Sequence, residues 1–484
     1  MAGANEICRM SAVTLAKLIR TKKLSPVEVT DAVLDRMDKL EPKIHAFNVP
    51  TPDLARKAAK QIEKAIMAKK DVGPCAGVPL GVKDLICTKD SLTTSGSIAY
   101  KDFVSDVDDI VVERLRAAGA IIIGKTNVPE FGYSGAGHNP IFETTRNPWN
   151  LEKTSGGSSA GSGAAVAAGM GPWALGSDGG GSVRIPSSFS GLYGLKGSMG
   201  RVPLWPGTRD ERYPGVSSWE ALECIGPMTR TVADAAFMMS IMAGPDMRDQ
   251  RSLPALEMPW MKTIKGGIKG LKVAYSPDWG YAAVDPEVRK VVGDAVKVFE
   301  KELGCKVEIA HPGFENPYGA FWSLVACESD LKGMRAMVAK HGAKMTPHLV
   351  EFIMRPWQAE DFTNAIMVRK GVVNKMAAFM QKYDLLLTPT LACAPFQLHV
   401  QGPEKIQGRM VDRFEWINFT YIMNMTGQPA ASIPAGFTKD GLPIGLQIVG
   451  RHLDDPTVLR ASACFEAARP WADQWPPLLD EMGL

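Results

Sequence analysis

The centre of the chain, residues 154–200, reads TSGGSSAGSGAAVAAGMGPWALGSDGGGSVRIPSSFSGLYGLKGSMG. Glycine, serine and alanine dominate this stretch, as they do in flexible linkers. Apolar residues nevertheless recur throughout it, among them Val166, Trp173, Ile185 and Phe189. A linker would not carry that apolar load. We therefore interpret residues 154–200 as a packed region in which small residues allow close backbone approach and special turns.

Strand and helix patterns alternate on both sides of this region. Buried strands are predicted at residues 77–84, 120–125, 384–390 and 442–449. A helical pattern at 110–118 separates the first two strands. This alternation of strand and helix is typical of an α/β fold.

Helix-start signals mark the N-terminal part of the chain. Ser25-Pro-Val-Glu28 has the pattern of a capping box with proline in the first turn, and predicts a helix from residue 25 onward. A second helix is predicted from Thr51 to about Ala68. Residues 203–222 and 312–370 are rich in aromatic side chains and irregular in pattern, so we expect insertions around a site there.

Length and composition place the chain among ordinary globular proteins. It has 484 residues, which exceeds the roughly 250–300 residues that a single core usually supports. The length alone therefore allows two or three domains, or one large α/β domain with insertions. Hydrophobic residues make up 45% and charged residues 22%, so the chain can bury a large core around a deep site.

The charge distribution gives no sign of a polyanionic partner. The 55 basic and 52 acidic residues leave a net charge of +3 and are mixed along the chain. The short basic clusters, Lys22-Lys23 and Lys69-Lys70, lie in helical surface patterns and are interpreted as solvated faces. We therefore expect neither nucleic acid nor an anionic membrane as a partner.

Cysteine usage and apolar runs bear on the cellular setting. The 8 cysteines are scattered, without a C-x-x-C pair or a Cys/His spacing typical of zinc, so we expect reduced thiols in a cytoplasmic protein and no metal site. The first residues lack the basic and apolar regions of a signal peptide. No run of about 18 apolar residues predicts a membrane span.

Ser182 ends the segment Ser177-Asp-Gly-Gly-Gly-Ser182 and is the candidate nucleophile. Three consecutive glycines let successive backbone N–H groups point into one concavity. Such a nest binds phosphate or an oxyanion, but the lysine of a phosphate-binding P-loop is missing. A hydroxyl at the end of the nest suits acyl transfer better, because nucleophile and oxyanion donors then share one site.

A serine nucleophile needs a base to remove its proton. None of the 7 histidines lies in a motif, and no G-x-S-x-G elbow is present. Lys83, at the end of an apolar strand, is the better candidate, because desolvation lowers the pKa of a lysine and leaves its amine able to accept a proton. The alternative for Lys83 is a strand-end lysine whose ammonium group reaches solvent.

Together with the motif Ser-Gly-Gly-Ser-Ser at 155–159, these residues resemble the amidase signature family, in which a lysine and two serines form the catalytic triad. The spacing of Lys83, Ser158 and Ser182 fits that family. Flanking segments match it as well, namely residues 124–131, 145–150, 226–230, 427–430 and 441–445. The resemblance covers most of the chain, from about residue 8 to about residue 475.

The resemblance implies a mixed central β-sheet covered by helices on both faces, in a single domain over residues 1–484. Its parts would be N-terminal helices at 1–70, a catalytic core at 71–260, a variable substrate-pocket region at 261–380 and the C-terminal part of the core at 381–484. Neither a metal nor an organic cofactor is implied. The family suggests a homodimer that acts on a small-molecule amide or carbamate.

The resemblance also assigns roles to the three candidate residues. Ser182 attacks the substrate carbonyl, Ser158 takes the proton of Ser182, and neutral Lys83 takes the proton of Ser158. The Gly157–Ser158 peptide bond is expected to be cis. The oxyanion hole would consist of the N–H groups of Gly179, Gly180, Gly181 and Ser182. Water then releases the acyl-enzyme.

Neighbouring residues receive supporting roles. The resemblance implies that Asp178 and Arg184 brace the nucleophile loop by hydrogen bonds and an ion pair. Ser155 is expected to orient Lys83 or Ser158.

Two further residues and three departures concern the substrate. Gly132 and Tyr133 align with a family segment that lines the acyl site, through backbone and side chain respectively. The chain departs from the family at Ala160, where glycine is commoner, at Gly179, where isoleucine or threonine is common, and at Gly197-Ser198, where Pro-Thr is usual. None of these departures removes a member of the triad.

Four functions compete within this resemblance. The first is hydrolysis of aryl acylamides, extending to carbamates, because the loop at 177–182 and the pair at 132–133 look like the bacterial aryl acylamidase and urethane-hydrolase branch. The second is a small aliphatic, cyclic-dimer or nylon-oligomer amidase. The third is an amidotransferase subunit that supplies ammonia for tRNA-linked glutamine. The fourth is a non-catalytic binding protein on an amidase scaffold, against which the intact triad argues.

Large side chains in the expected insertions bear on the first function. The sequence at residues 128–135 and the net charge bear on the third. Several large side chains in the expected insertions either line an apolar funnel or belong to the core: Trp205, Tyr213, Trp219, Tyr318, Phe321, Trp322, Trp357, Phe362 and Met367. The amidotransferase branch usually carries Met-Asp-Glu-Phe-Ala-Met-Gly-Ser-Ser, whereas residues 128–135 read VPEFGYSG. The near-neutral charge also gives no tRNA footprint.

Overall fold

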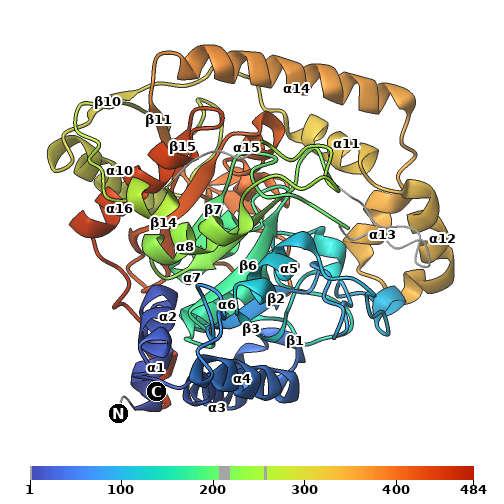
Figure 1. Ribbon diagram of the computed structural model, residues 1–484. Coiled ribbons are helices and arrows are strands. Elements are labelled where there is room, and N and C mark those ends of the chain that lie inside the picture. The colour runs from blue at the N-terminus through green and yellow to red at the C-terminus, as the bar shows by residue number, and fades with distance from the viewer. Residues whose placement is uncertain (1–2, 207–218, 255–258) are drawn as a thin grey trace.

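A large mixed β-sheet forms the centre of the protein (Figure 1). The computed structural model describes residues 3–206, 219–254 and 259–484. Within these residues the sheet has eleven strands in the order β1-β3-β2-β6-β8-β7-β14-β15-β11-β9-β10. Their bounds are β1 Phe47–Pro50, β2 Pro79–Lys83, β3 Ile121–Thr126, β6 Trp173–Asp178, β7 Tyr193–Lys196, β8 Cys224–Thr229, β9 Lys272–Tyr275, β10 Lys306–Ile309, β11 Leu385–Pro389, β14 Ala430–Phe437 and β15 Pro443–Gly450.

The direction of the strands explains where the candidate residues meet. β2 runs parallel to both β3 and β6, so the carboxyl ends of these strands lie at one edge of the sheet. Lys83 ends β2, and Ser177 and Asp178 end β6. β6, β8, β7, β14 and β15 then follow with antiparallel pairing, and parallel pairing returns between β11, β9 and β10.

Helices flank the sheet on both faces, in two groups. α6 and α7 pack against each other and against strands from β2 to β15, while α8, α10 and α16 form a second connected group over β7, β8, β14 and β15. The helices are α1 Ala4–Arg9, α2 Ala12–Arg20, α3 Pro26–Ile44, α4 Pro52–Met67, α5 Ile110–Ala117, α6 Ala160–Ala167, α7 Arg184–Ser190, α8 Val232–Met242, α9 Trp260–Thr263, α10 Pro286–Lys301, α11 Tyr318–Cys327, α12 Leu331–His341, α13 Pro347–Met354, α14 Ala359–Met380, α15 Tyr421–Thr426, α16 Asp455–Ala468 and α17 Pro477–Glu481. Two small ribbons lie outside the main sheet, β4 Arg146–Asn147 with β5 Asn150–Thr154, and β12 Lys405–Ile406 with β13 Arg409–Met410.

The predicted α/β class and mixed central sheet are confirmed. The capping box that predicted α3 is present, because Ser25 N donates to Glu28 Oε2 at 2.9 Å and the Ser25 hydroxyl accepts from Val27 N. The four strands predicted from the apolar runs correspond to β2, β3, β11 and β15. The division of the chain into N-terminal, core, pocket and C-terminal parts stays a prediction.

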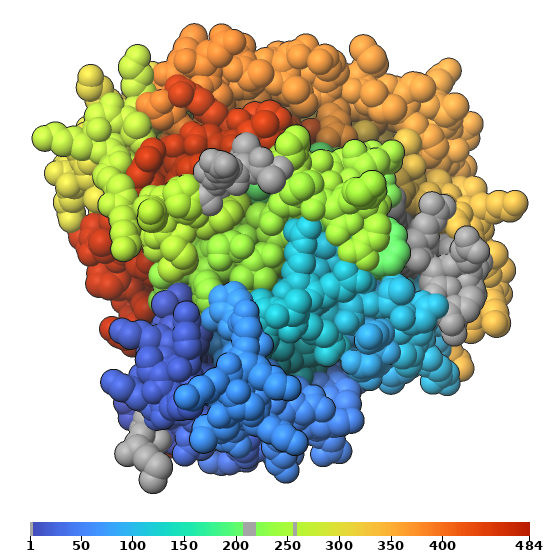
Figure 2. Space-filling view, viewed as in Figure 1, coloured from blue at the N-terminus to red at the C-terminus, as the bar shows by residue number. Residues whose placement is uncertain are grey.

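The expected insertions differ from their prediction. Residues 312–370 are mainly helical rather than irregular, since they contain α11, α12, α13 and the first half of α14. Figure 2 shows the orange segment that includes α14 covering one end of the molecule. Most of the other insertion, residues 203–222, lies outside the described residues. In the described part of the chain, no helix combines the length and apolar character needed to cross a membrane.

Candidate active site

Lys83 meets Ser158 at the carboxyl edge of the sheet. Its Nζ donates to Ser158 Oγ at 2.7 Å, to Ser177 Oγ at 2.9 Å and to the Ser177 carbonyl at 3.1 Å. The side chain is completely buried, so the alternative of a lysine that reaches solvent is wrong. Burial lowers the pKa of Lys83 to about 7, although the carboxylates of Glu223 and Asp178 act in the opposite direction. An amine in that range can accept a proton near neutral pH.

Ser158 and Ser182 lie on adjacent loops. The Gly157–Ser158 peptide bond is cis, as the family resemblance implies. Ser159 N donates to the Ser182 carbonyl at 3.2 Å, which ties the two loops together. Both serines are buried, and Ser182 lines a small cavity. The structure therefore brings all three candidate residues to one place.

The glycine loop presents three backbone donors rather than four. Gly181 N donates to Asp178 Oδ1 at 2.8 Å, which removes this N–H group from the expected oxyanion hole. Within the described residues, the N–H groups of Gly179, Gly180 and Ser182 make no hydrogen bond to the protein. Gly181 is therefore removed from the predicted hole, and Gly179, Gly180 and Ser182 stay its candidate donors.

At two positions in this loop only glycine fits without a close contact. Gly181 has a φ of +124°, and a Cβ atom there would lie 2.3 Å from Thr420 Oγ1. A Cβ atom on Gly179 would lie 2.9 Å from the ring of Trp219. Thr420 Oγ1 also donates to the Gly180 carbonyl at 2.7 Å, so the loop is held closely by a residue from the C-terminal part of the chain.

Asp178 and Arg184 stabilise the glycine loop through hydrogen bonds and an ion pair. Arg184 donates to both carboxylate oxygens of Asp178, at 2.8 Å and 2.9 Å, and both side chains are completely buried. Burial alone would raise the pKa of Asp178, but the Arg184 guanidinium outweighs it and lowers that pKa to about 2. Asn424 Nδ2 donates to Asp178 Oδ1 at 2.9 Å as well. This geometry agrees with the supporting role expected of the pair.

Ser155 does not occupy the place expected of it. Its hydroxyl donates to the Gly156 carbonyl at 3.4 Å, and among the described residues it forms no hydrogen bond with Lys83 or Ser158. Ser177 orients Lys83 instead. No local sequence pattern marks Ser177 for this role, because it depends on how β6 and β2 pair in the sheet.

Gly132 and Tyr133 line the small cavity beside Ser182, and their role at an acyl site stays a prediction. Gly132 has a φ of +78°, and a Cβ atom there would lie 2.9 Å from Leu85 Cδ1 and 3.3 Å from Ser158 Oγ. This cavity of about 40 Å³ also borders Gly179 and Gly180. It therefore places the Ser182 hydroxyl and the backbone of Gly179 and Gly180 around one small space.

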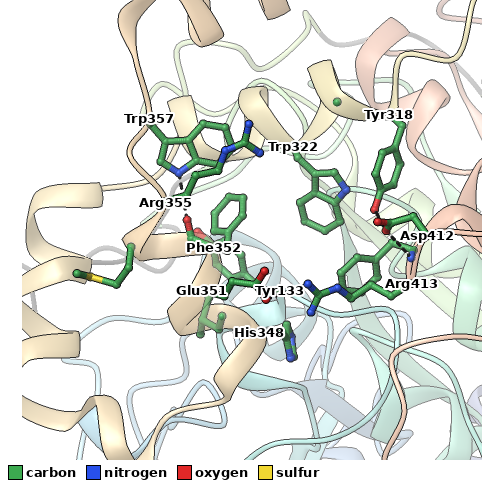
Figure 3. Close-up of a pocket in the computed structure, with 14 residues that line it drawn as sticks. Tyr133, Tyr318, Trp322, His348, Glu351, Phe352, Arg355, Trp357, Asp412 and Arg413 are labelled. Atoms are coloured by element: carbon green, nitrogen blue, oxygen red, sulfur yellow. Dashed lines mark hydrogen bonds and ion pairs between the residues drawn. The ribbon is translucent and has the colours of Figure 1, made fainter.

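A larger cavity of about 600 Å³ adjoins the small one. Tyr133, Trp322 and Phe414 line both cavities. Figure 3 shows the rings of Trp322, Phe352 and Trp357 and the guanidinium groups of Arg355 and Arg413 around the larger space. Arg413 forms an ion pair with Glu351 at 2.8 Å. The larger cavity is thus walled by aromatic rings, with charged groups among them.

The histidines have other hydrogen-bond partners than the two serines. Among the described residues, no histidine forms a hydrogen bond with Ser158 or Ser182. His348 lines the larger cavity, where burial lowers its pKa to about 4.

Comparison with known proteins places this geometry in a family. The family model described as Amidase matches residues 28–459. The chain belongs to the amidase family. Its relatives include the acylamidase of Rhodococcus erythropolis, which is 40% identical over 96% of this chain and 97% of its own length. One component of the glutamyl-tRNA(Gln) amidotransferase of Sulfurihydrogenibium sp. is 32% identical over 97% of this chain and 99% of its own length.

Solved structures of amide hydrolases share the fold of this amidase. A bacterial aryl acylamidase of the amidase signature family superposes with a TM-score of 0.89, at 33% identity, over 97% of this chain and 98% of the other. The 6-aminohexanoate cyclic dimer hydrolase has a TM-score of 0.86 at 29% identity, over 98% of this chain and 99% of the other. The chain is therefore an amidase, an enzyme that hydrolyses amide bonds.

The large side chains singled out from the sequence of this amidase divide into two groups. Those that line the two cavities are Trp219, Tyr318, Phe321, Trp322 and Trp357. Trp205, Phe362 and Met367 lie outside the described walls of both cavities, where Phe362 stacks on Trp357 and Met367 is exposed. Tyr213 lies outside the described residues.

Proposed function

We propose that this amidase hydrolyses aryl acylamides through an acyl-enzyme formed on Ser182. One observation carries the proposal: the small cavity at Ser182 shares Tyr133, Trp322 and Phe414 with a larger cavity that has aromatic walls. Aromatic rings bind a planar aryl group by offset or edge-to-face packing. The 40% identity to an acylamidase supports the same substrate class.

The first half of the reaction forms the acyl-enzyme. Ser182 Oγ attacks the carbonyl carbon of the amide, while Ser158 takes the proton of Ser182 and passes its own proton to Lys83. The Lys83–Ser158 contact of 2.7 Å is short enough for that transfer. The developing negative charge on the carbonyl oxygen is stabilised by the N–H groups of the glycine loop.

The second half releases both products. The Lys83 ammonium returns its proton through Ser158 to the nitrogen of the leaving aryl amine, and the C–N bond breaks. Water then attacks the acyl-enzyme and gives up a proton along the same path, which regenerates Ser182. Carbamates present the same carbonyl with an ester-type oxygen beside it, and we propose them as a second group of substrates for this site.

Hydrolysis of 4-nitroacetanilide by wild type and Ser182→Ala tests the proposal. We expect wild type to release nitroaniline, and Ser182→Ala to lose at least about a thousandfold in kcat, because the nucleophile is absent. The kcat of Lys83→Ala should fall by a similar factor. An aryl carbamate and a short aliphatic amide, assayed in parallel, separate the aryl acylamidase from a urethane hydrolase and from an aliphatic amidase.

Ser240→Ala is the matched control, because Ser240 is an exposed serine on α8 whose hydroxyl donates to the Phe237 carbonyl. It should retain wild-type turnover. Undiminished nitroaniline release by Ser182→Ala would overturn the nucleophile assignment. Turnover of the aliphatic amide alone would overturn the aryl substrate class and leave the mechanism standing.

A further inference from the structure

Glu223 lies next to the catalytic lysine without having been singled out from the sequence. It immediately precedes β8, which pairs antiparallel with β6 so that Ile225 lies opposite Ser177 and Cys224 opposite Asp178. Side chains two residues apart in an extended segment point to the same side. Glu223 is therefore the diagonal neighbour of Ser177 on one face of the sheet, at a separation that a long side chain spans.

Ser177 connects Glu223 to Lys83. The Ser177 side chain is near enough to lower the pKa of Glu223, as the strand register implies, and Ser177 Oγ accepts from Lys83 Nζ at 2.9 Å. Within the described residues no carboxylate lies within 4 Å of Lys83 Nζ. The carboxylate therefore reaches the amine through one hydroxyl group rather than through a direct ion pair.

We infer that Glu223 is a positioning residue for amide hydrolysis, which through Ser177 holds Lys83 against Ser158 and stabilises the ammonium group that Lys83 becomes. This inference rests on the proposed function, because it requires Lys83 to be the proton acceptor. Glu223 exchanges no proton with the substrate. The proton of Ser182 passes to Ser158, that of Ser158 passes to Lys83, and the negative charge of Glu223 lowers the energy of the resulting cation.

The other acidic groups near this site leave Glu223 as the effective charge. Asp178 also raises the pKa of Lys83, but less than Glu223 does, and the Arg184 guanidinium offsets its charge by donating to both carboxylate oxygens. Burial raises the pKa of Asp109 well above its ordinary value, with Glu223 itself contributing to the rise. Burial also raises the pKa of Glu223, and the nearby Lys83 lowers it. Glu223 and Lys83 thus form a coupled pair in which each favours the charged form of the other.

The test is the pH dependence of the sulfonylation of Ser182 in the full chain. Phenylmethanesulfonyl fluoride reacts with an activated serine by forming a sulfonate ester and releasing fluoride, so its rate reports the proton acceptor without knowledge of the substrate. The second-order labelling rate would be measured between pH 5 and pH 9 for wild type, Glu223→Gln and Glu223→Asp. Mass spectrometry would locate the label on Ser182.

The expected result is a shift along the pH axis. Wild-type labelling rises with pH as Lys83 loses its proton. Glu223→Gln removes a charge that favours the ammonium form, so the pKa of Lys83 falls and the acid limb should move to lower pH by about one unit. Because the weaker base accepts a proton less readily, the plateau rate should fall by about tenfold. Glu223→Asp keeps the charge and should keep the acid limb at the wild-type position.

A merely structural role for Glu223 would lower the rate equally at every pH and leave the limb in place, which would overturn the inference while the proposed function stands. A wild type that is not labelled on Ser182 would overturn both. Should Glu223→Gln fail to fold, Ser177→Ala decides the question, because breaking the link must move the limb in the same direction.

Glu466→Gln provides the matched control. Glu466 is another packed glutamate, whose pKa burial raises to about 7, but its carboxylate accepts from Val232 N at the start of α8 rather than contacting the triad. Its pH profile for labelling should coincide with that of wild type.

Discussion

Burial alone does not turn a lysine into a base. Lys83, Lys125 and Lys196 are all completely shielded from solvent, but their partners differ. Lys125 Nζ lies 3.6 Å from Asp84 Oδ1, and a carboxylate at that distance favours the ammonium form. Lys83 Nζ meets the Ser158 hydroxyl instead. This hydroxyl partner distinguishes Lys83 from Lys125 and is the partner that the proposed proton transfer requires.

Trp322→Ala tests the aromatic wall at the level of one side chain. Trp322 lines both cavities and packs edge-to-face on Phe321 at 5.3 Å. Removing its ring takes away apolar contact with an aryl group, so KM for 4-nitroacetanilide should rise by about tenfold with kcat changed little. Steady-state kinetics with the anilide and with a short aliphatic amide provide the measurement.

Trp205→Ala is the control for that substitution, because Trp205 lies outside both cavities and packs under the Arg248 guanidinium instead. It should leave both KM values near wild type. An equal rise in KM for the anilide and the aliphatic amide after Trp322→Ala would contradict a specific aryl site.

The sequence predicts the reactive groups of this site better than their supports. Lys83, Ser158 and Ser182 stand in motifs with their own chemical meaning, and the structure brings them together. Ser177 and Glu223 act across a strand pair, so their roles depend on register, which local sequence does not show. The resemblance treats the glycine loop as a unit and so places the Gly181 N–H in the oxyanion hole, whereas Asp178 Oδ1 accepts it.

At the scale of elements, the loop between β6 and α7 concentrates the steric demands of the site. Gly181→Ala should disable this loop, because the φ of +124° disfavours any side chain and the new Cβ atom would lie 2.3 Å from Thr420 Oγ1. We expect at least a hundredfold loss of kcat/KM, together with a free energy of unfolding lowered by about 2 kcal/mol. Hydrolysis assays and urea denaturation measure the two effects.

Gly371→Ala is the opposite case and the control. Gly371 lies on the exposed side of α14, and a Cβ atom added there would meet no other atom within 4 Å. Alanine favours helix over glycine, so this substitution should stabilise the protein by up to about 1 kcal/mol with unchanged activity. Equal changes in kcat/KM and in free energy of unfolding for Gly181→Ala and Gly371→Ala would contradict the steric argument.

The elements themselves are predictable where one pattern dominates. The apolar runs that form β2, β3, β11 and β15 are buried along their whole length, which makes them recognisable without knowledge of their partners. The helices of residues 312–370 are not recognisable in this way. α11 is apolar on most sides and begins after Pro317 without a side-chain cap, so neither amphipathic period nor capping signal marks it.

At the scale of the whole molecule, Asp234 joins the N-terminal helices to the core. This completely buried residue of α8 accepts from Ala12 N at 3.1 Å and from Val13 N at 2.9 Å, at the start of α2. Burial raises the pKa of Asp234 to about 6. The folded protein thus keeps the proton to higher pH than the unfolded chain, where an aspartic acid ionises near pH ~3.9.

Asp234→Asn should therefore change how stability depends on pH. Because the unfolded wild-type chain ionises first, wild type loses free energy of unfolding as pH rises from about 4 to 6, by up to about 3 kcal/mol from this group. The asparagine variant lacks that loss. Urea denaturation at pH 4 and pH 7 should show wild type losing stability relative to the variant between the two values.

Asp294→Asn serves as the comparison, because Asp294 is an exposed residue of α10 that pairs with Lys290 and Lys297. The difference in free energy of unfolding between Asp294→Asn and wild type should change little over the same pH range. Parallel profiles of wild type and Asp234→Asn would contradict the raised pKa.

The bracing of the nucleophile loop has a consequence for the protein during its synthesis. Arg184 donates to the Thr420 carbonyl at 2.8 Å and to Gln447 Oε1 at 2.6 Å, and both partners come from the last part of the chain. A ribosome completes Lys83, Ser158 and Ser182 long before it reaches them. The nascent chain therefore carries every reactive group while the loop that must hold them is still unsupported. We therefore expect chains released by termination before Thr420 to be inactive, although they contain all three candidate residues.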